Sequence, residues 1–282
     1  MTGRIVITGA AGLVGRVLAG QAAQQGRDVV TLTSSQWDIT DPAAGASVVR
    51  SGDVVVNCAA YTKVDAAEAE PERAHLVNAV GAGNVARVCA RAGAALIHLS
   101  TDYVFDGALR RPYDIDDPTG PVSVYGRTKL AGEQAVHAEL PDACVVRTAW
   151  IYEGRDGTDF AAAMRRAALG EGTVDVVADQ IGSPTYVGDL CAALLQIADG
   201  VRAPLLHAAN DGAVSRFEQA QAVFSSVGAD PARVRPVDSS QHPRPAPRPA
   251  YSALSAQKST LAGLSPLRPW REALAAALLS SP

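Results

Sequence analysis

The glycine-rich segment at residues 8–15 constrains the fold of this chain more than any other feature. It reads Thr8-Gly9-Ala10-Ala11-Gly12-Leu13-Val14-Gly15 and separates a short apolar run from an Ala-rich amphipathic stretch. In a strand–turn–helix unit, glycines at this kind of spacing allow a sharp turn, close approach of a pyrophosphate and tight packing of the helix on the sheet. The helix N-terminus then offers unpaired N–H groups to phosphates. The segment therefore predicts a dinucleotide-binding turn.

Apolar runs alternate with Ala-rich stretches through the first half of the chain. The predicted buried strands are Arg4–Thr8, Asp28–Leu32, Val54–Cys58, Leu96–Ser100 and Cys144–Thr148. The predicted helices are Leu13–Gln25, Pro42–Arg50, Glu72–Ala92 and Val124–Glu139. Strands and helices that alternate in this way indicate parallel βαβ units with right-handed crossovers. The expected fold class is α/β, a Rossmann-type doubly wound parallel sheet.

The alternation loosens after residue 148, and this change divides the chain. We expect a dinucleotide-binding Rossmann domain over residues 1–148 and a smaller α/β substrate-binding region over residues 149–282. Strands predicted near 174–177 and 205–208 are expected to return to the main sheet. The stretch Pro243–Pro249 has alternating prolines and is predicted to be a rigid surface linker, not a helix.

Composition narrows the functional classes. A formal net charge of -4 argues against a nucleic-acid groove or binding to an anionic membrane, and no apolar run is long enough to span a bilayer. The four cysteines lie far apart without a CxxC pair, which excludes a zinc ribbon and indicates reduced thiols in the cytoplasm. The histidines are scattered, so no metal is expected. A monomer and a homodimer are both compatible with the sequence.

The end of the second predicted strand bears on the choice of cofactor. A carboxylate usually stands there when a site holds an adenosine ribose as a diol. Residues 31–35 read Thr-Leu-Thr-Ser-Ser, with neither a carboxylate nor an arginine. Hydroxyls can accept a 2′-phosphate, so NADPH is the preferred cofactor and NADH a possible one. Asp38 and Ile39 suit the adenine edge, although Asp38 is equally compatible with an ordinary loop carboxylate.

Tyr125 and Lys129 stand four residues apart at the start of a predicted helix and therefore share one face. An ammonium near a phenol stabilises the phenolate and lowers the tyrosine pKa. The same ammonium can bind a nicotinamide ribose. The pair Ser100-Thr101, at the end of the preceding strand, supplies a hydroxyl for a carbonyl oxygen. The pair alone also fits a solvated helix face, but its place after the fourth strand favours an active site.

Together these motifs resemble the extended short-chain dehydrogenase/reductases, and longer strings narrow the resemblance to the dTDP-4-dehydrorhamnose reductase family. The strings are 56–65 (VNCAAYTKVD) with Glu68, 100–107 (STDYVFDG), 125–133 (YGRTKLAGE), 147–152 (RTAWIY) and 179–185 (DQIGSPT). The match covers the N-terminal two thirds and weakens afterwards. It implies reduction of the 4-keto group of a dTDP-linked 4-keto-6-deoxy sugar, with NADPH as the preferred reductant, in nucleotide-deoxysugar biosynthesis.

The resemblance also implies a role for each matching residue. The catalytic residues are Thr101, Tyr125 and Lys129. The cofactor-binding residues are Gly9, Gly12, Leu13, Val14, Thr33, Ser34, Asp38, Ile39, Ala59, Ala60, Tyr61, Thr62, Tyr125 and Lys129. The substrate-binding residues are Thr101, Asp102, Tyr103 and Trp150. From the residues alone, Trp150 also fits a core aromatic and Asp102 a turn-forming residue.

Departures from the family pattern leave the identity of the sugar open. Relatives usually carry Trp where Arg216 stands, Asn where Tyr251 stands and Asn where Asp159 stands. A 4,6-dehydratase or a 4-epimerase is one alternative function. Dehydratases typically follow the Thr with Asp-Glu, whereas this chain has Asp102-Tyr103. The other alternative is a non-catalytic regulatory subunit, like that of methionine adenosyltransferase, against which the intact catalytic set argues.

Overall fold

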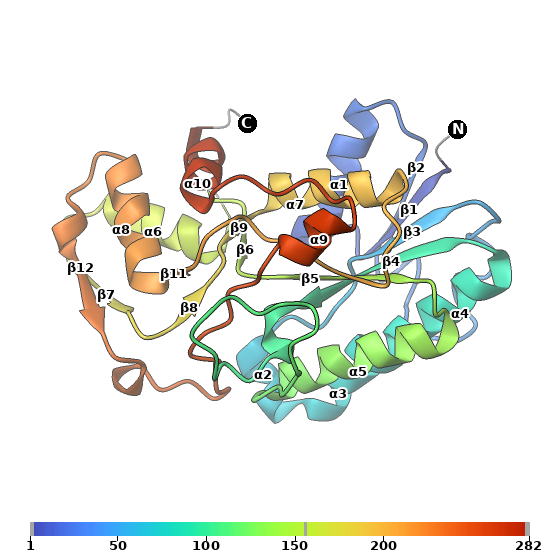
Figure 1. The fold of residues 1–282 in the computed structure, drawn as a ribbon, viewed down its shortest axis with the longest axis horizontal. Helices are drawn as coiled ribbons and strands as arrows, with labels where there is room; N and C mark the ends of the chain where they lie inside the picture. The colour runs from blue at the N-terminus through green and yellow to red at the C-terminus, as the bar shows by residue number, and fades with distance from the viewer. Residues whose placement is uncertain (1–2, 155–156, 280–282) are drawn as a thin grey trace.

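A six-stranded parallel sheet forms the centre of the protein, for which a computed structural model describes residues 3–154 and 157–279 (Figure 1). The strand order is β10-β5-β4-β3-β1-β2, and every neighbouring pair in it is parallel. The bounds are β1 Ile5–Thr8, β2 Val29–Leu32, β3 Val54–Asn57, β4 Ala95–Thr101, β5 Cys144–Thr148 and β10 Leu205–His207. The predicted α/β doubly wound fold is confirmed.

Helices cover both faces of this sheet (Figure 1). One face carries α1 (Leu13–Gln24) and α7 (Val187–Ala198), and the other carries α4 (Ala82–Ala92) and α5 (Val124–Glu139). The shorter α2 (Val64–Ala69), α3 (Pro71–His75) and π-helical η1 (Leu76–Gly81) precede α4. Along β1, Ile5 and Ile7 pack in the first core while Val6 packs in the second. This alternation is the period of two that a doubly covered strand requires.

The strand order indicates where a ligand would bind on this sheet. The chain turns from β1 to β2 on one side, and then returns to place β3 on the other side of β1. Ligands of doubly wound sheets bind outside the carboxyl ends of the strands at such a switch point. Here that edge collects the segments after β1, β3, β4 and β5.

The helix predicted over Pro42–Arg50 is wrong. Residues 42–48 form turns, and Gly45 adopts a φ of +84°. A left-handed residue interrupts an α-helix. The Trp37 indole packs so closely on Gly45 that an added Cβ would stand 2.2 Å from it. Residues 42–48 therefore form a turn that packs on Trp37 where the sequence predicted a helix.

The C-terminal region builds several small sheets of its own. The strand predicted near 205–208 forms β10 at the edge of the main sheet, but the one predicted near 174–177 does not join that sheet. That strand, β7 (Val174–Val177), pairs with β12 (Val234–Val237) and packs under α6 (Phe160–Ala168) and α8 (Arg216–Ser226). The expectation for 174–177 is therefore corrected, because Val176 is buried in this separate core.

The remaining elements connect the two parts of the molecule. They are β6 (Ile151–Tyr152) paired with β9 (Thr185–Tyr186), β8 (Ile181–Gly182) paired with β11 (Val214–Ser215), the helices α9 (Gln257–Leu261) and α10 (Trp270–Leu279), and the short 3₁₀ turns η2 (Asp102–Val104), η3 (Pro231–Arg233) and η4 (Ser239–Gln241). Residues 243–249 form neither helix nor strand, as predicted.

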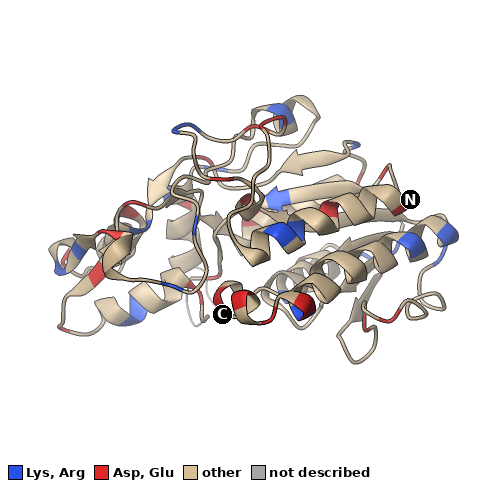
Figure 2. Cartoon of the chain, turned by 90° about the horizontal axis from the view of Figure 1, so that it is seen from below, with Lys and Arg blue, Asp and Glu red and all other residues tan. Residues whose placement is uncertain are grey.

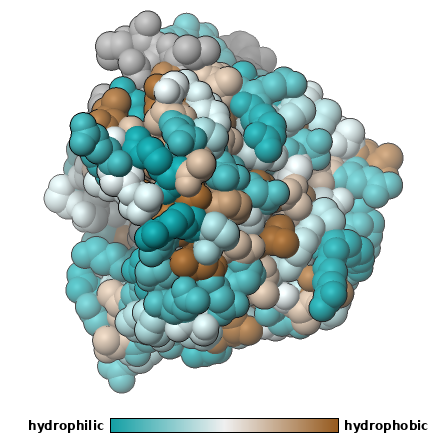
Figure 3. Space-filling model, turned by 90° about the vertical axis from the view of Figure 1, so that its left-hand side faces the viewer, coloured by the Kyte–Doolittle hydropathy of each residue, from teal (hydrophilic) through white to brown (hydrophobic). Residues whose placement is uncertain are grey.

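Charged residues of both signs are distributed over the fold, and the described residues on the face in Figure 3 form no large apolar patch. Acidic and basic residues are interspersed along the elements drawn in Figure 2. The face in Figure 3 is mainly hydrophilic, with small separate apolar spots. Within residues 3–154 and 157–279, no helix has the combination of length and apolarity needed to cross a bilayer. The same residues contain no group of three His, Cys, Asp or Glu side chains arranged to hold a metal ion.

Candidate active site

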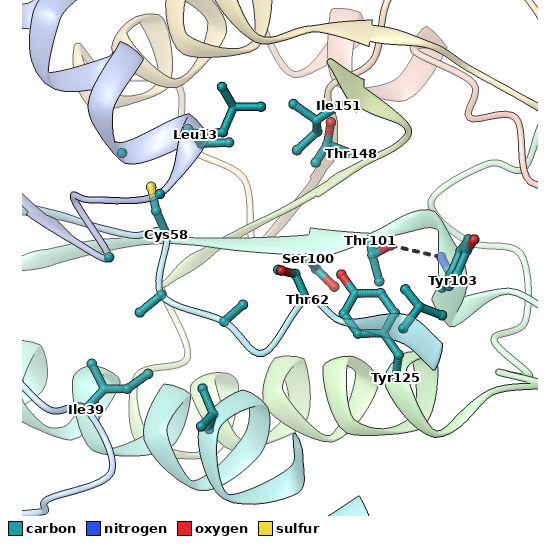
Figure 4. Close-up of a pocket in the computed structure, with 18 of the residues that line it drawn as sticks. Leu13, Ile39, Cys58, Thr62, Ser100, Thr101, Tyr103, Tyr125, Thr148 and Ile151 are labelled. Atoms are coloured by element: carbon teal, nitrogen blue, oxygen red, sulfur yellow. Dashed lines mark hydrogen bonds between the residues drawn. The ribbon is translucent and has the colours of Figure 1, made fainter. Parts of the chain in front are cut away.

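A cleft of about 780 Å³ opens at the carboxyl edge of the sheet. Most of the predicted site residues line it, namely Gly9, Gly12, Leu13, Val14, Ser34, Asp38, Ile39, Ala59, Ala60, Thr62, Thr101, Asp102, Tyr103, Tyr125 and Trp150. Thr33, Tyr61 and Lys129 are not among its lining residues. Figure 4 shows Leu13, Cys58 and Ile39 toward one end of the cleft, and Thr101, Tyr103 and Tyr125 toward the other.

The glycine-rich turn has the geometry that a pyrophosphate needs. Gly9 adopts a φ of +63°, and a Cβ there would stand 2.6 Å from the backbone nitrogen of Ala59. A Cβ on Gly15 would stand 2.6 Å from the carbonyl oxygen of Gly9. No side chain caps the N-terminus of α1 after Gly12. The N–H groups of the first helical turn therefore face the cleft without a side-chain acceptor, as an anion site requires.

The loop after β2 closes the same end of the cleft. Asp38 accepts hydrogen bonds from the Thr40 hydroxyl at 2.7 Å and the Thr40 amide at 2.9 Å, and these bonds lower its pKa. The Thr33 hydroxyl contacts the Ser35 hydroxyl at 2.9 Å and the Gln36 amide oxygen at 3.0 Å. Thr33 is thus tied into its own turn, which explains why it does not line the cleft, whereas Ser34 does.

The start of α5 positions Tyr125. The Ser123 hydroxyl caps the helix by accepting from the Gly126 amide at 3.1 Å. A Cβ on Gly126 would stand 2.2 Å from the Tyr103 carbonyl oxygen, so only glycine lets the helix begin this close to η2. The ring of Tyr125 consequently meets that of Tyr103 edge-on, with 5.7 Å between centroids. In Figure 4 its hydroxyl points toward Ser100 and Thr101.

Tyr125 and Thr101 form the polar centre of the cleft. Burial raises the pKa of the Tyr125 phenol, and hydrogen bonding with the Thr101 side chain acts against this rise. The Thr101 hydroxyl donates to Asp102 at 3.0 Å and accepts from the Tyr103 amide at 3.2 Å. The phenol is therefore protonated at neutral pH and can serve as a proton donor.

The Lys129 ammonium lies against the backbone of β4. It donates to the Leu99 carbonyl oxygen at 2.6 Å, and burial lowers its pKa to about 8. The expected lowering of the Tyr125 pKa by Lys129 is contradicted, because that pKa is raised. Although both residues lie on α5, the buried lysine side chain runs to the backbone of β4.

Ser100 also lines the cleft, but its hydroxyl is engaged by a buried ion pair. Its hydroxyl donates to Glu133, whose carboxylate also pairs with the Arg147 guanidinium at 2.7 and 2.9 Å. All three side chains are buried. Of the two neighbouring residues, Thr101 is therefore the one whose hydroxyl contacts Asp102 and Tyr125.

Asp102 joins the cleft to a distant part of the chain. It is 2% exposed, and burial raises its pKa to about 6. The Ser252 hydroxyl donates to it at 2.6 Å from 150 residues away. Sequence reasoning missed Ser252 as a site residue, because neither residue type nor spacing connects it to Asp102.

Trp150 and Arg216 both line the cleft and pack against each other. Trp150 has a φ of +45°, a conformation that bulky L-residues rarely adopt. Its indole packs on Gly182, where an added Cβ would stand 2.3 Å from Cε2. The Arg216 guanidinium lies 3.5 Å above the indole ring centroid. Strained residues concentrate at functional sites, which supports Trp150 as a site residue.

A dinucleotide-type turn at the switch point, in one cleft with a partly buried phenol one helical turn before a lysine, defines the short-chain dehydrogenase/reductase class. Within that class the chain belongs to the RmlD substrate binding domain family, whose model matches residues 3–281. The protein is 67% identical over 277 residues to a dTDP-4-dehydrorhamnose reductase of Mycolicibacterium smegmatis, covering 97% of this chain and 84% of that protein.

Two further relatives support this assignment. A dTDP-4-dehydrorhamnose reductase of Mycobacterium tuberculosis is 64% identical over 280 residues, covering 98% of this chain and 92% of the relative. The crystal structure of a Bacillus anthracis dTDP-4-dehydrorhamnose reductase in complex with NADP superposes with a TM-score of 0.92. It is 36% identical and covers 97% of this chain and 98% of the other. The protein is accordingly an oxidoreductase of this family.

Proposed function

We propose that this protein uses NADPH to reduce the 4-keto group of a dTDP-linked 4-keto-6-deoxy sugar. The observation that carries the proposal is that one cleft has the glycine-rich turn with Leu13 toward one end and Tyr125 with Thr101 toward the other, and that Trp150 and Arg216 line the same cleft. One end is shaped for a dinucleotide and the other is free for a sugar nucleotide. The names of the reductases reported above, and the NADP in one of them, point to the same reaction.

The cofactor end fits NADPH. Gly9 and Gly12 open the backbone, and the first turn of α1 at Leu13 and Val14 would hold the pyrophosphate. Ser34, Asp38 and Ile39 would hold the adenosine, and Ala59, Ala60 and Thr62 would line the path to the nicotinamide. When bound, NADPH supplies a hydride. Because the loop after β2 lacks a carboxylate to repel a 2′-phosphate, NADPH would be preferred, and NADH would still bind.

The chain's own groups would supply the proton and the orientation. The Tyr125 phenol would donate its proton to the C4 oxygen of the sugar as that oxygen gains negative charge on reduction. The Thr101 hydroxyl would hold the carbonyl oxygen near Tyr125. The buried Lys129 ammonium would bind the nicotinamide ribose after exchanging its contact with Leu99. The expected cofactor contacts of Thr33 and Tyr61 stay predictions, since neither lines the cleft.

The region over 149–282 would cover the sugar nucleotide, while 1–148 would hold the dinucleotide. Asp102, Tyr103 and Trp150 would contact the sugar. Asp102 is already fixed by Ser252, which belongs to the C-terminal part of the chain. The site would thus close on its substrate with groups from both parts.

The test is NADPH oxidation by the purified protein with a panel of dTDP-4-keto-6-deoxyhexoses, with the product configuration determined by NMR. Tyr125→Phe should lower kcat by at least about 100-fold, the low end for loss of a general acid. Tyr152→Phe is the matched control, since the buried Tyr152 hydroxyl has no hydrogen-bond partner among the described residues.

Two results would contradict the proposal. Wild-type turnover in Tyr125→Phe would remove the phenol from the mechanism. Failure to oxidise NADPH with every keto sugar, together with a tightly retained cofactor, would favour an epimerase or a dehydratase.

A further inference from the structure

Arg216 occupies a fixed position in the wall of the cleft. It is the first residue of α8, directly after the N-cap Ser215, whose hydroxyl accepts from the Glu218 amide at 3.1 Å. The Glu218 carboxylate in turn accepts from the Ser215 amide at 3.0 Å, which completes a capping box. The guanidinium then lies between two aromatic rings, 3.5 Å from the Trp150 centroid and 4.8 Å from that of Phe160.

The charge of Arg216 has no carboxylate partner within ion-pair distance in the described parts of the chain. Its one hydrogen bond runs from Nη1 to the Gln219 amide oxygen at 3.1 Å. The other arginines near the cleft are neutralised: Arg248 binds both oxygens of Asp65 at 2.6 and 2.9 Å, and Arg147 binds Glu133. A guanidinium has five N–H donors and keeps its charge in proteins. Most of the Arg216 donors are therefore available to a ligand.

Arg216 also brings the positive charge of the cleft wall. Among the described residues that line the cleft it is the one Lys or Arg side chain. Burial lowers its pKa, and Tyr103 and Asp102 act to raise it. A partly desolvated cation without a counter-ion is costly, and an anion bound beside it offsets that cost.

We propose that Arg216 binds the diphosphate of the sugar nucleotide. The inference rests on the proposed function and adds the residue that recognises the non-reacting part of the substrate. The cofactor pyrophosphate would be held at the N-terminus of α1, where Leu13 lies toward the other end of the cleft. Arg216 instead lies with Asp102, Tyr103 and Trp150, where the sugar would bind. A diphosphate attached to that sugar would bring the missing negative charge.

The stacking contact gives Arg216 a second effect on the substrate. Because its guanidinium covers one face of the Trp150 indole and Gly182 packs on the same ring, the sugar would meet the indole mainly at its free edge. The planar guanidinium can stack and bind a phosphate at the same time, which an ammonium cannot. Arg216→Lys is therefore expected to be only a partial replacement.

The experiment compares binding of dTDP and thymidine to the intact protein by calorimetry, with Arg216→Gln, Arg216→Lys and the wild type. Arg216→Gln should raise the Kd for dTDP by about 10- to 100-fold, the range for a hydrogen bond to a charged group. Arg216→Lys should fall between the two. The Kd values for thymidine and NADPH should not change. Arg235→Gln on β12, which removes an exposed pair with Asp175, is the control.

The alternatives give different results. If Arg216→Gln weakens dTDP and thymidine equally, Arg216 acts only by packing on Trp150 and the inference is overturned. Unchanged dTDP binding in both variants, or no dTDP binding by the wild type, overturns it as well. A wild-type protein that binds dTDP through Arg216 but reduces no keto sugar would leave the diphosphate site standing and refute the proposed function.

Discussion

Replacing Gly182 by alanine tests the position of Trp150 without removing any group that touches substrate. Gly182 lies outside the left-handed region, so alanine fits its backbone without strain. The added Cβ would stand 2.3 Å from Cε2, 2.5 Å from Cζ2 and 2.7 Å from Nε1 of the Trp150 indole. Ordinary contacts between such atoms are about 3.5–4.0 Å, so the indole has to move by about 1 Å or more.

This displacement sets the expected magnitude. Overpacking of this kind costs about 1–3 kcal/mol of stability. Misplacement of a positioning group by about 1 Å can lower the rate by about 100-fold. We therefore expect Gly182→Ala to lower kcat/KM for the sugar nucleotide by about 10- to 100-fold, with the Kd for NADPH unchanged.

The assay is steady-state kinetics with the keto sugar varied, together with NADPH binding and thermal melting. Gly20→Ala is the matched control, because Gly20 is exposed on α1 and an added Cβ meets nothing within 4 Å. That substitution should leave kinetics unchanged and stabilise the helix by about 0.5–1 kcal/mol. Wild-type sugar kinetics in Gly182→Ala, or equal weakening of both ligands, would refute the role given to Trp150.

Three further predictions follow from the same cleft. Trp150→Ala should raise the KM for the sugar while NADPH affinity stays the same. A loss of about 3–5 kcal/mol of stability, with both ligands bound more weakly, would instead show that Trp150 is a structural core residue. Asp102 has a folded-state pKa of about 6 against an ordinary 3.8, so its stabilising contribution is complete below pH 3.8 and is lost as pH rises through 6. Over that window the wild type should lose up to about 3 kcal/mol that Asp102→Asn does not lose, and parallel melting curves against pH would contradict this. NADPH should give a higher kcat/KM than NADH by about tenfold or less, since the loop after β2 has neither a repelling carboxylate nor a binding arginine; a tenfold preference for NADH would show that the loop was misinterpreted.

The sequence by itself determined the features that depend on neighbouring residues. The main strands through residue 148 lie within about one residue of their predicted bounds, because each is a short apolar run that the period of a covered strand makes recognisable. The glycine spacing located the turn before α1, and the four-residue spacing placed Tyr125 and Lys129 on one helix. Local periodicity and turn chemistry carry this information.

Only the tertiary structure decided which distant groups meet. The contact of Ser252 with Asp102, the stack of Arg216 on Trp150 and the pairing of β7 with β12 join segments far apart in the chain. No local pattern encodes such contacts, since they depend on how the packed elements fill the interior. Burial likewise turned Lys129 to the Leu99 carbonyl and raised the pKa of Tyr125, because desolvation is a property of the folded environment.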